Sequence, residues 1–526
     1  MSKIPASGRL LLLGLDAGEW TLIQRWANEG LLPTFRRLLD EGASGELRST
    51  AAQFVEPVWH CLFTGLNPGK WEKYFYIQLV PGTLRLKQVS DDSPCASPFW
   101  ELLSEAGYRV GVVDAPKFPV SENLHGFQLA NWGAHGTRAP RRSTPESLLD
   151  EVLTRYGPHP VGDCGPMSAR RDRVLARFRP RLLSGVHLRG RLIRDLMRRE
   201  PWDVFLAVFS ETHCAGHLYW HWYDKDHPAH PEKDPLGLSN TLLAVYQAID
   251  REVGLTLEQA GSEVTTFVFA PHGMGPLYHA TWNLQEILDL LGYGSRPQVS
   301  AKSRAGRINP YRLLRVGLPG WLQYRIKSML PKRLEDYLVF NWYGGNRDWA
   351  GTRAFAVPNG DHVGAIRINL RGREPHGTVR PDEYDAVCQD LTDAFHELRD
   401  PDSGCPVVRQ VSKSRELFHG PYLEQLPDLT VLWNAERPWV ALESPRIGRL
   451  RLHDQDIRTG GHTPRGFVIA RGKGIPAGAR LTGHSALDLA PTFLAAAGVK
   501  PPEDLDGHPL PYCSAPVPDR GEVSAR

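Results

Sequence analysis

Residues 204–223 read VFLAVFSETHCAGHLYWHWY and connect a strand pattern to a pair of histidines. The apolar run at 204–209 predicts a buried strand, and His213 and His217 follow it four residues apart. A helix beginning near Thr212, a residue type that suits an N-cap, would place both imidazoles on one helical face. That face lies past the carboxyl end of the strand, where open α/β sheets bind ligands. The pair can bind one metal ion if a third ligand comes from elsewhere, and the alternative is a structural histidine pair beside an aromatic cluster.

Length and composition exclude some classes of protein. A chain of 526 residues is long enough for one large core with insertions or for two domains. Its 62 Lys and Arg nearly balance 59 Asp and Glu, and no basic stretch is interleaved with aromatic residues, so we expect no nucleic-acid partner. The seven scattered cysteines predict reduced thiols in a cytoplasmic protein. The apolar run at 10–13 is too short for a signal peptide or a membrane span, so we expect no stable membrane insertion.

Strand and helix patterns alternate along the first half of the chain. The segment RLLLLGLD at 9–16 predicts a buried parallel strand with Asp16 at its carboxyl end. Further units are predicted at 20–41 (a helix interrupted near Pro33), 98–114 (helix then strand), 240–261 (helix) and 265–270 (strand). This alternation predicts a doubly wound, mostly parallel sheet. The last of these strands ends beside His272, so it delivers another histidine to a strand end.

Two segments depart from the alternation. Residues 140–201 are rich in Arg and Pro, and we interpret them as peripheral, with a helical second half. Residues 291–345 mix basic and apolar residues, which indicates a helical insertion or cap. A solvated helical face is favoured there over an anion-binding lid or a membrane-surface helix. We therefore expect residues 1–290 and 346–512 to form two parts of one core, followed by a disordered tail at 513–526.

The order of short motifs along the chain resembles the alkaline phosphatase superfamily, in particular its type I phosphodiesterase/nucleotide pyrophosphatase branch. The motifs are LLLGLDAGEW, PVWHCLFTGLNPGK, the histidine segment, PHGMGP, RINLRGREPHG, GGHTPRGFVIARGKGI and LDLAPTFLAAAGVKPPEDLDGHPL. The resemblance implies an alkaline-phosphatase-like three-layer α/β sandwich with a mostly parallel central sheet and a helical insertion. It also implies a two-metal site in which a Thr or Ser attacks phosphorus and is then released by water.

The resemblance assigns seven positions of this chain to the two metals. The first metal, held in the family by one Asp and two His, corresponds to His213, His217 and His462. The second, held by two Asp, one His and the nucleophile, corresponds to Asp16, Val55, Pro271 and His272.

Three of these positions differ from the family pattern. Val55 has no side-chain oxygen, so a covalent mechanism cannot run through it. Pro271 removes a carboxylate ligand from the second metal, which leaves Asp16 and His272. His213 stands where the family has Asp, and the resulting three-histidine set suits one Zn²⁺ with an open coordination position.

Two carboxylates near these positions are candidate catalytic residues. Glu56 follows the vacant nucleophile position, and Glu211 precedes the histidine pair. Either one could restore a carboxylate ligand or act as a general base. The alternative for each is an acid at a helix N-terminus or a partner in a salt bridge.

The sequence therefore predicts a metal-dependent hydrolase of a phosphoester, a phosphodiester or a related anionic small molecule. A zinc-bound hydroxide would replace the side-chain nucleophile, and Asp16 and His272 would bind a weaker second metal or orient substrate and water. One alternative is a zinc enzyme repurposed for amide, ester or elimination chemistry in specialised metabolism. Another is a catalytically inactive binding module that uses the same pocket for an anionic ligand.

Overall fold

The computed structural model describes residues 8–89, 96–134, 139–162, 172–295, 347–360, 362–452 and 458–513. The helical insertion predicted at 291–345 lies outside these residues except for its first five positions. The disordered tail predicted at 513–526 lies outside them except for Cys513.

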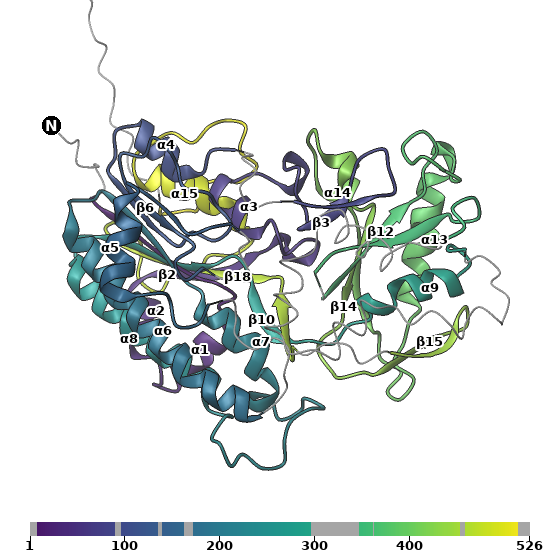
Figure 1. Ribbon diagram of the computed structural model, residues 1–526, viewed down its shortest axis with the longest axis horizontal. Helices are drawn as coiled ribbons and strands as arrows, with labels where there is room; N and C mark the ends of the chain where they lie inside the picture. The colour runs from purple at the N-terminus through teal and green to yellow at the C-terminus, as the bar shows by residue number, and fades with distance from the viewer. Residues whose placement is uncertain are drawn as a thin grey trace, which may run out of the picture.

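An eight-stranded sheet forms the centre of the larger part of the molecule, in the order β2-β18-β9-β1-β8-β5-β6-β7 (Figure 1). The middle strands β1 (Leu10–Leu15), β8 (Val204–Phe209) and β9 (Thr265–Ala270) are parallel, and every residue in them is buried. The parallel set continues with β5 (Val110–Val113) and β6 (Gly126–Ala130). Antiparallel strands complete the two edges: β18 (Arg465–Arg471), β2 (Ala43–Arg48) and β7 (Arg142–Thr144). The predicted mostly parallel sheet is confirmed.

Helices cover both faces of this sheet. In β1, Leu11, Leu13 and Leu15 belong to one buried cluster and Leu10 and Leu12 to another, because successive side chains of a strand point to opposite faces. The first face carries α1 (Trp20–Asn28), α2 (Pro33–Glu41), α5 (Ser147–Tyr156), α6 (Asp172–Arg199), α7 (Glu211–Tyr223) and α8 (Thr241–Ala260). The second face carries α3 (Val58–Thr64), α4 (Phe99–Glu105) and α15 (Leu489–Ala496). The result is the predicted three-layer α/β sandwich.

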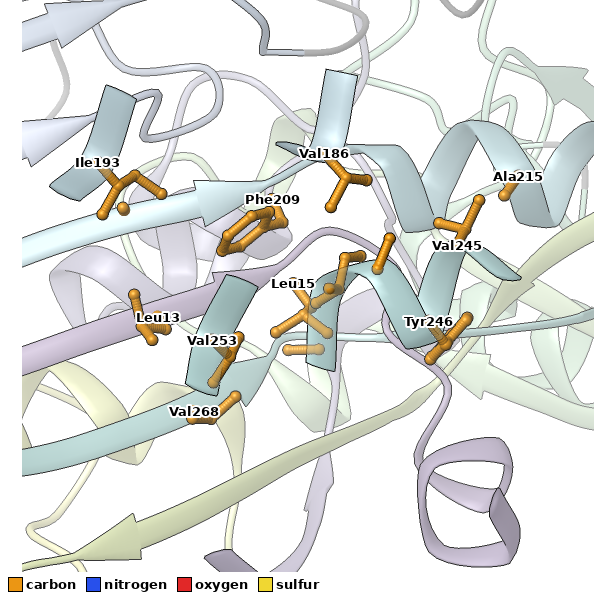
Figure 2. Close-up of a cluster of buried hydrophobic side chains, with 14 of the residues drawn as sticks. Leu13, Leu15, Val186, Ile193, Phe209, Ala215, Val245, Tyr246, Val253 and Val268 are labelled. Atoms are coloured by element: carbon orange, nitrogen blue, oxygen red, sulfur yellow. The ribbon is translucent and has the colours of Figure 1, made fainter. Parts of the chain in front are cut away.

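Helix α6 is part of the core, so the interpretation of residues 140–201 as peripheral was wrong for its second half. The helix is 28 residues long and packs against α8. Its buried stripe includes Val186 and Ile193, which Figure 2 shows among core side chains such as Leu13, Phe209 and Val253. Many arginines share the helix with this apolar stripe. The composition of the segment therefore does not reveal that its apolar residues recur with helical periodicity and face the sheet.

A second, smaller sheet lies beside the large one (Figure 1). Its four strands are antiparallel, in the order β11 (Ala354–Val357), β12 (Val363–Ile368), β14 (Leu429–Trp433) and β13 (Val408–Lys413). It shares an apolar cluster with α9 (Leu284–Leu290) and α13 (Tyr384–His396). We expected residues 346–512 to act as one part of the core, but residues 347–452 contribute this separate sheet. Only residues 458–513 return to the large sheet, through β18 and α15.

Short strand pairs, one short α-helix and several 3-10 helices complete the described structure. The pairs are β3 (Ile77–Leu79) with β4 (Leu86–Gln88), β10 (Gly273–Pro276) with β17 (Gly460–Thr463), and β15 (Ala441–Ser444) with β16 (Gly448–Arg451); the helix is α14 (Ser414–Leu417). Among the helices of the described ranges, none combines the length and the apolar character that a bilayer crossing requires. Cys214 is disulfide-bonded, so the prediction that all the thiols are reduced was wrong at that position, whereas Cys388, Cys405 and Cys513 are free thiols.

Candidate metal centre

The start of α7 is fixed to the carboxyl end of β1. The helix begins at Glu211, near Thr212 as expected, but its N-cap is Ser210 and not Thr212. The Thr212 hydroxyl instead donates to the backbone carbonyl of Asp16 at 2.6 Å, and the Asp16 amide donates to the carbonyl of Phe209 at 2.8 Å. These two bonds hold the ends of β1 and β8 together. The histidines of α7 therefore lie at the edge of the sheet where Asp16 also stands.

Three histidines meet at this edge. His213 and His217 project from α7, and His462 is supplied by β17. One ligand nitrogen of each lies within 4.8 Å of the other two, and in the described part of the chain no other group of three or more His, Cys, Asp or Glu meets this condition. Nε2 of His213 is 2.9 Å from Nε2 of His462. The structure thus brings together the three residues that the sequence proposed for the first metal.

The geometry of this donor set fits a zinc ion. Two nitrogens that each lie 2.0–2.1 Å from a tetrahedral zinc are roughly 3.3 Å apart, so the His213–His462 pair needs to open by only a few tenths of an ångström. His217 is already oriented, because its Nδ1 donates to the carbonyl of Gly460 at 2.6 Å and so carries the proton. Its Nε2 is then the atom with the lone pair, and a carbonyl that fixes the ring of a metal-binding histidine in this way is common.

The electrostatic environment keeps His462 in the form that binds metals. Burial, followed by the neighbouring rings of His272, His217 and His362, holds the pKa of His462 well below its usual range. A neutral imidazole offers a lone pair, whereas an imidazolium does not.

Asp16 and His272 form a second pair beside the three histidines. His272 follows β9, and its Nε2 lies 3.6 Å from Oδ1 of Asp16. The same oxygen accepts a hydrogen bond from the indole of Trp59 at 3.0 Å. The ring centroid of His272 is 4.8 Å from that of His462. The pair can therefore contact a substrate or a second ion next to the three-histidine set, but it supplies only two protein ligands.

Glu56 is held between two lysines. Its Oε2 lies 2.7 Å from Nζ of Lys117 and its Oε1 lies 3.8 Å from Nζ of Lys73, and the carboxylate is buried. The salt bridge considered from the sequence is therefore the arrangement observed. These contacts place two positive charges and one negative charge next to Val55.

Glu211 belongs to a buried ion network with Arg189 and His159. Its Oε1 accepts from Nε of Arg189 at 3.0 Å and lies 2.9 Å from Nε2 of His159. Burial alone would raise the pKa of Glu211, but Arg189 and then His159 lower it to about 2. Its carboxylate is ionised and engaged by Arg189 and His159, so the contacts favour the structural alternative over a role as general base.

His362 is a further histidine near the site, and no motif around it in the sequence singles it out. It lies between β11 and β12 of the small sheet, with its ring centroid 5.7 Å from that of His462. Its Nε2 donates to the carbonyl of Ala51 at 3.0 Å. Burial, with a smaller contribution from nearby histidines, lowers the pKa of His362 to about 4. A Cβ built on Gly360 would lie 3.6 Å from its Nδ1 and 2.9 Å from Cγ1 of Val55, so His362 and Val55 both lie next to Gly360.

Comparison with known families gives one match over most of the chain. The model of the type I phosphodiesterase/nucleotide pyrophosphatase family matches residues 10–456. A search of curated protein sequences returned no significant match.

Two kinds of solved structure are similar to this chain at low sequence identity. One is murine ectonucleotide pyrophosphatase/phosphodiesterase 5, as an inactive variant in complex with AMP, with 13% identity, a TM-score of 0.46 and coverage of 94% of this chain and 96% of that chain. The other is phosphonoacetate hydrolase from Sinorhizobium meliloti 1021 in complex with phosphonoformate, with 14% identity, a TM-score of 0.49 and coverage of 94% and 97%.

Proposed function

The chain belongs to the type I phosphodiesterase/nucleotide pyrophosphatase family, and we propose that it is a zinc-dependent hydrolase of a phosphoester, phosphodiester or related anionic small molecule. The observation that carries this proposal is the convergence of His213, His217 and His462, with ligand nitrogens within 4.8 Å of one another. Three neutral nitrogens with one position left open are the donor set of many hydrolytic zinc sites. Bound there, Zn²⁺ would supply a Lewis acid and lower the pKa of a coordinated water.

The other residues of the site would then bind and orient the reactants. Val55 carries no nucleophile, so water must attack directly and no covalent intermediate forms on this residue. Asp16 and His272, 3.6 Å apart, lie beside the three histidines and can accept and donate hydrogen bonds to water and substrate. The Lys73–Glu56–Lys117 group adds one net positive charge next to Val55, and this charge favours an anionic substrate.

A second candidate is a zinc enzyme that acts on amide, ester or elimination substrates. The specific observation in its favour is Val55, because phosphoryl transfer through a side-chain nucleophile is lost while the three-histidine set is kept. Rates measured side by side on phosphoester, phosphodiester, amide and ester substrates separate the two candidates. Turnover of phosphate substrates alone rules out the second candidate.

Metal content is the first test of the proposal. Protein purified without added metal should contain about one zinc per chain by elemental analysis, and His213→Ala and His462→Ala should each lose it. His396→Ala, an exposed histidine at the end of α13, is the matched control and should keep its zinc. Two metals per chain would mean that Asp16 and His272 complete a second site. Absence of zinc from the wild type would overturn the proposal in favour of a binding module.

A further inference from the structure

We propose that Thr459 and His221 act as a pair of positioning residues that set the distance between His462 and the two histidines of α7. This inference rests on the zinc site proposed above and concerns what holds its third ligand in place. His462 stands on β17, which belongs to a different part of the sequence from α7, so some contact must fix the strand against the helix. Thr459, immediately before β17, provides that contact.

Thr459 contacts the helix backbone at two points one turn apart. Its amide donates to the carbonyl of His217 at 3.0 Å, and its hydroxyl oxygen accepts from the amide of His221 at 3.3 Å. In a regular helix the amide of residue i+4 donates to the carbonyl of residue i. The His217 carbonyl and the His221 amide have this spacing, so Thr459 contacts two backbone groups that face each other across one turn of α7. The strand is therefore joined to α7 at the turn that carries His217.

The side chain of His221 completes the contact. Its Nδ1 is 2.9 Å from the Thr459 hydroxyl, and its backbone carbonyl accepts from Nδ1 of His230 at 2.8 Å. Thr459 is 2% exposed and His221 is 8% exposed, so water is largely excluded from these bonds. A buried hydroxyl that makes such bonds is costly to remove, because the groups it satisfies lose their partner.

Besides its pairing with β10, β17 is in direct backbone contact with α7. A Cβ on Gly460 would be 2.2 Å from the carbonyl oxygen of Gly216, so strand and helix backbones touch with no side chain between them. The carbonyl of Gly460 also accepts from Nδ1 of His217. The bond that orients one metal ligand and the bonds made by Thr459 therefore come from adjacent residues. A shift of Thr459 moves both the His217 acceptor and, three residues on, His462.

Zinc affinity is the quantity that this arrangement should control. The dissociation constant is measured with zinc alone, by competition with a chromophoric chelator, on metal-free protein. Thr459→Val keeps the shape but removes the hydroxyl, and we expect its dissociation constant to rise by about 10–100-fold, as is typical when a group that orients metal ligands is lost. Thr459→Ser keeps the hydroxyl and should stay near the wild-type affinity.

Two further variants separate positioning from general loss of stability. Thr256→Val removes another buried hydroxyl, which donates to the carbonyl of Glu252 within α8, and should leave zinc affinity unchanged. His221→Phe keeps a ring but removes Nδ1, and it should weaken zinc binding. If the two residues act as a pair, the double variant Thr459→Val with His221→Phe should bind zinc about as tightly as the single variant that binds zinc more weakly. If their effects are independent, the two losses of affinity should add.

The outcomes are distinct. Affinity within about twofold of wild type in Thr459→Val, equal losses in Thr459→Ser and Thr459→Val, or additive losses in the double variant would each overturn the inference. If the wild type binds no zinc, the proposed function itself fails. If the wild type binds zinc and His217→Ala abolishes it while Thr459→Val has no effect, the proposed site stands and only the positioning role is lost.

Discussion

Replacing Arg189 by Met should destabilise the protein by about 3–5 kcal/mol, because it leaves two buried carboxylates without their cation. Arg189 is 0% exposed in the middle of α6. Its Nε donates to Glu211 at 3.0 Å, its Nη1 to Asp114 at 2.5 Å and its Nη2 to the carbonyl of Gly133 at 2.6 Å. A single guanidinium thus joins α6, the first residue of α7 and the loop after β5.

The magnitude follows from what remains after the substitution. Asp114 keeps the amides of Trp132 and Gly133, at 2.8 and 2.9 Å, and Glu211 keeps His159. Neither carboxylate keeps a permanent positive charge. Burial, which tends to raise the pKa of Glu211, would then be opposed only by His159, so in the variant this group resists ionisation at neutral pH.

The pH dependence of this effect has a definite sign. In the wild type the folded pKa of Glu211, about 2, lies below its unfolded value of 4.5. Its contribution is therefore complete above pH 4.5 and is lost as the pH falls toward 2. In the variant the folded pKa is raised, so the cost of ionised Glu211 grows as the pH rises. The difference between wild type and variant should be largest near neutral pH and shrink on acidification.

Urea unfolding of the metal-free proteins measures the difference. The control is Arg198→Met, on the same helix, whose guanidinium is 59% exposed in its ion pair with Asp195 and should cost only about 0–1 kcal/mol. A second variant, Arg189→Met with Glu211→Gln, should recover part of the loss because one uncompensated charge is gone. A loss in Arg189→Met as small as that of the control would refute the reasoning.

Two further predictions concern the vicinity of Val55. Burial lowers the folded pKa of His362 to about 4 from an ordinary value of 6.5, so its contribution is complete above pH 6.5 and is lost as the pH falls toward 4. The metal-free wild type should lose stability between pH 7 and pH 5, and His362→Gln should reduce this loss by about 2 kcal/mol. If the urea midpoints at pH 7 and pH 5 differ as much in the variant as in the wild type, this prediction is wrong. Val55→Thr restores a hydroxyl while Pro271 still lacks a carboxylate, so we expect no stoichiometric burst on an activated phosphodiester; a burst would show that the site had not been retuned.

The residues that the sequence placed at the site share a local signal. His213 and His217 are four apart directly after an apolar strand, and Asp16 ends another apolar strand. The carboxyl ends of neighbouring parallel strands meet at one edge, so a correct strand pattern brings such residues together without knowledge of the tertiary packing. His462 could be selected only through the resemblance to the family, because β17 reaches α7 through a pairing with β10 that leaves no pattern along the chain.

Three residues near the site have surroundings that depend on partners far away in the chain, which the sequence alone does not reveal. Glu211 is neutralised by Arg189 on a helix that composition had suggested was peripheral. Glu56 is paired with Lys117, 61 positions later. His362 is buried because the loop between two strands of the small sheet docks on the carbonyl of Ala51. In each case the side chain type is ordinary for a surface, and only the packing of separate segments turns it into a buried charge or a neutral ring.

The changes at the site are consistent with one another when its charge is considered. The resemblance implies that two divalent metals in the family are held by three Asp carboxylates, which leaves one net positive charge when the nucleophile is not counted. In this chain two of those positions are His213 and Pro271, and Asp16 is the carboxylate that remains. One zinc ion on three neutral histidines beside Asp16, as proposed above, would again leave one net positive charge. Loss of two carboxylates together with one divalent metal would therefore preserve the attraction for an anionic substrate, whereas loss of the two carboxylates alone or of the metal alone would change the net charge by two. Under the proposed function, the remaining ligands therefore support one zinc per chain rather than two.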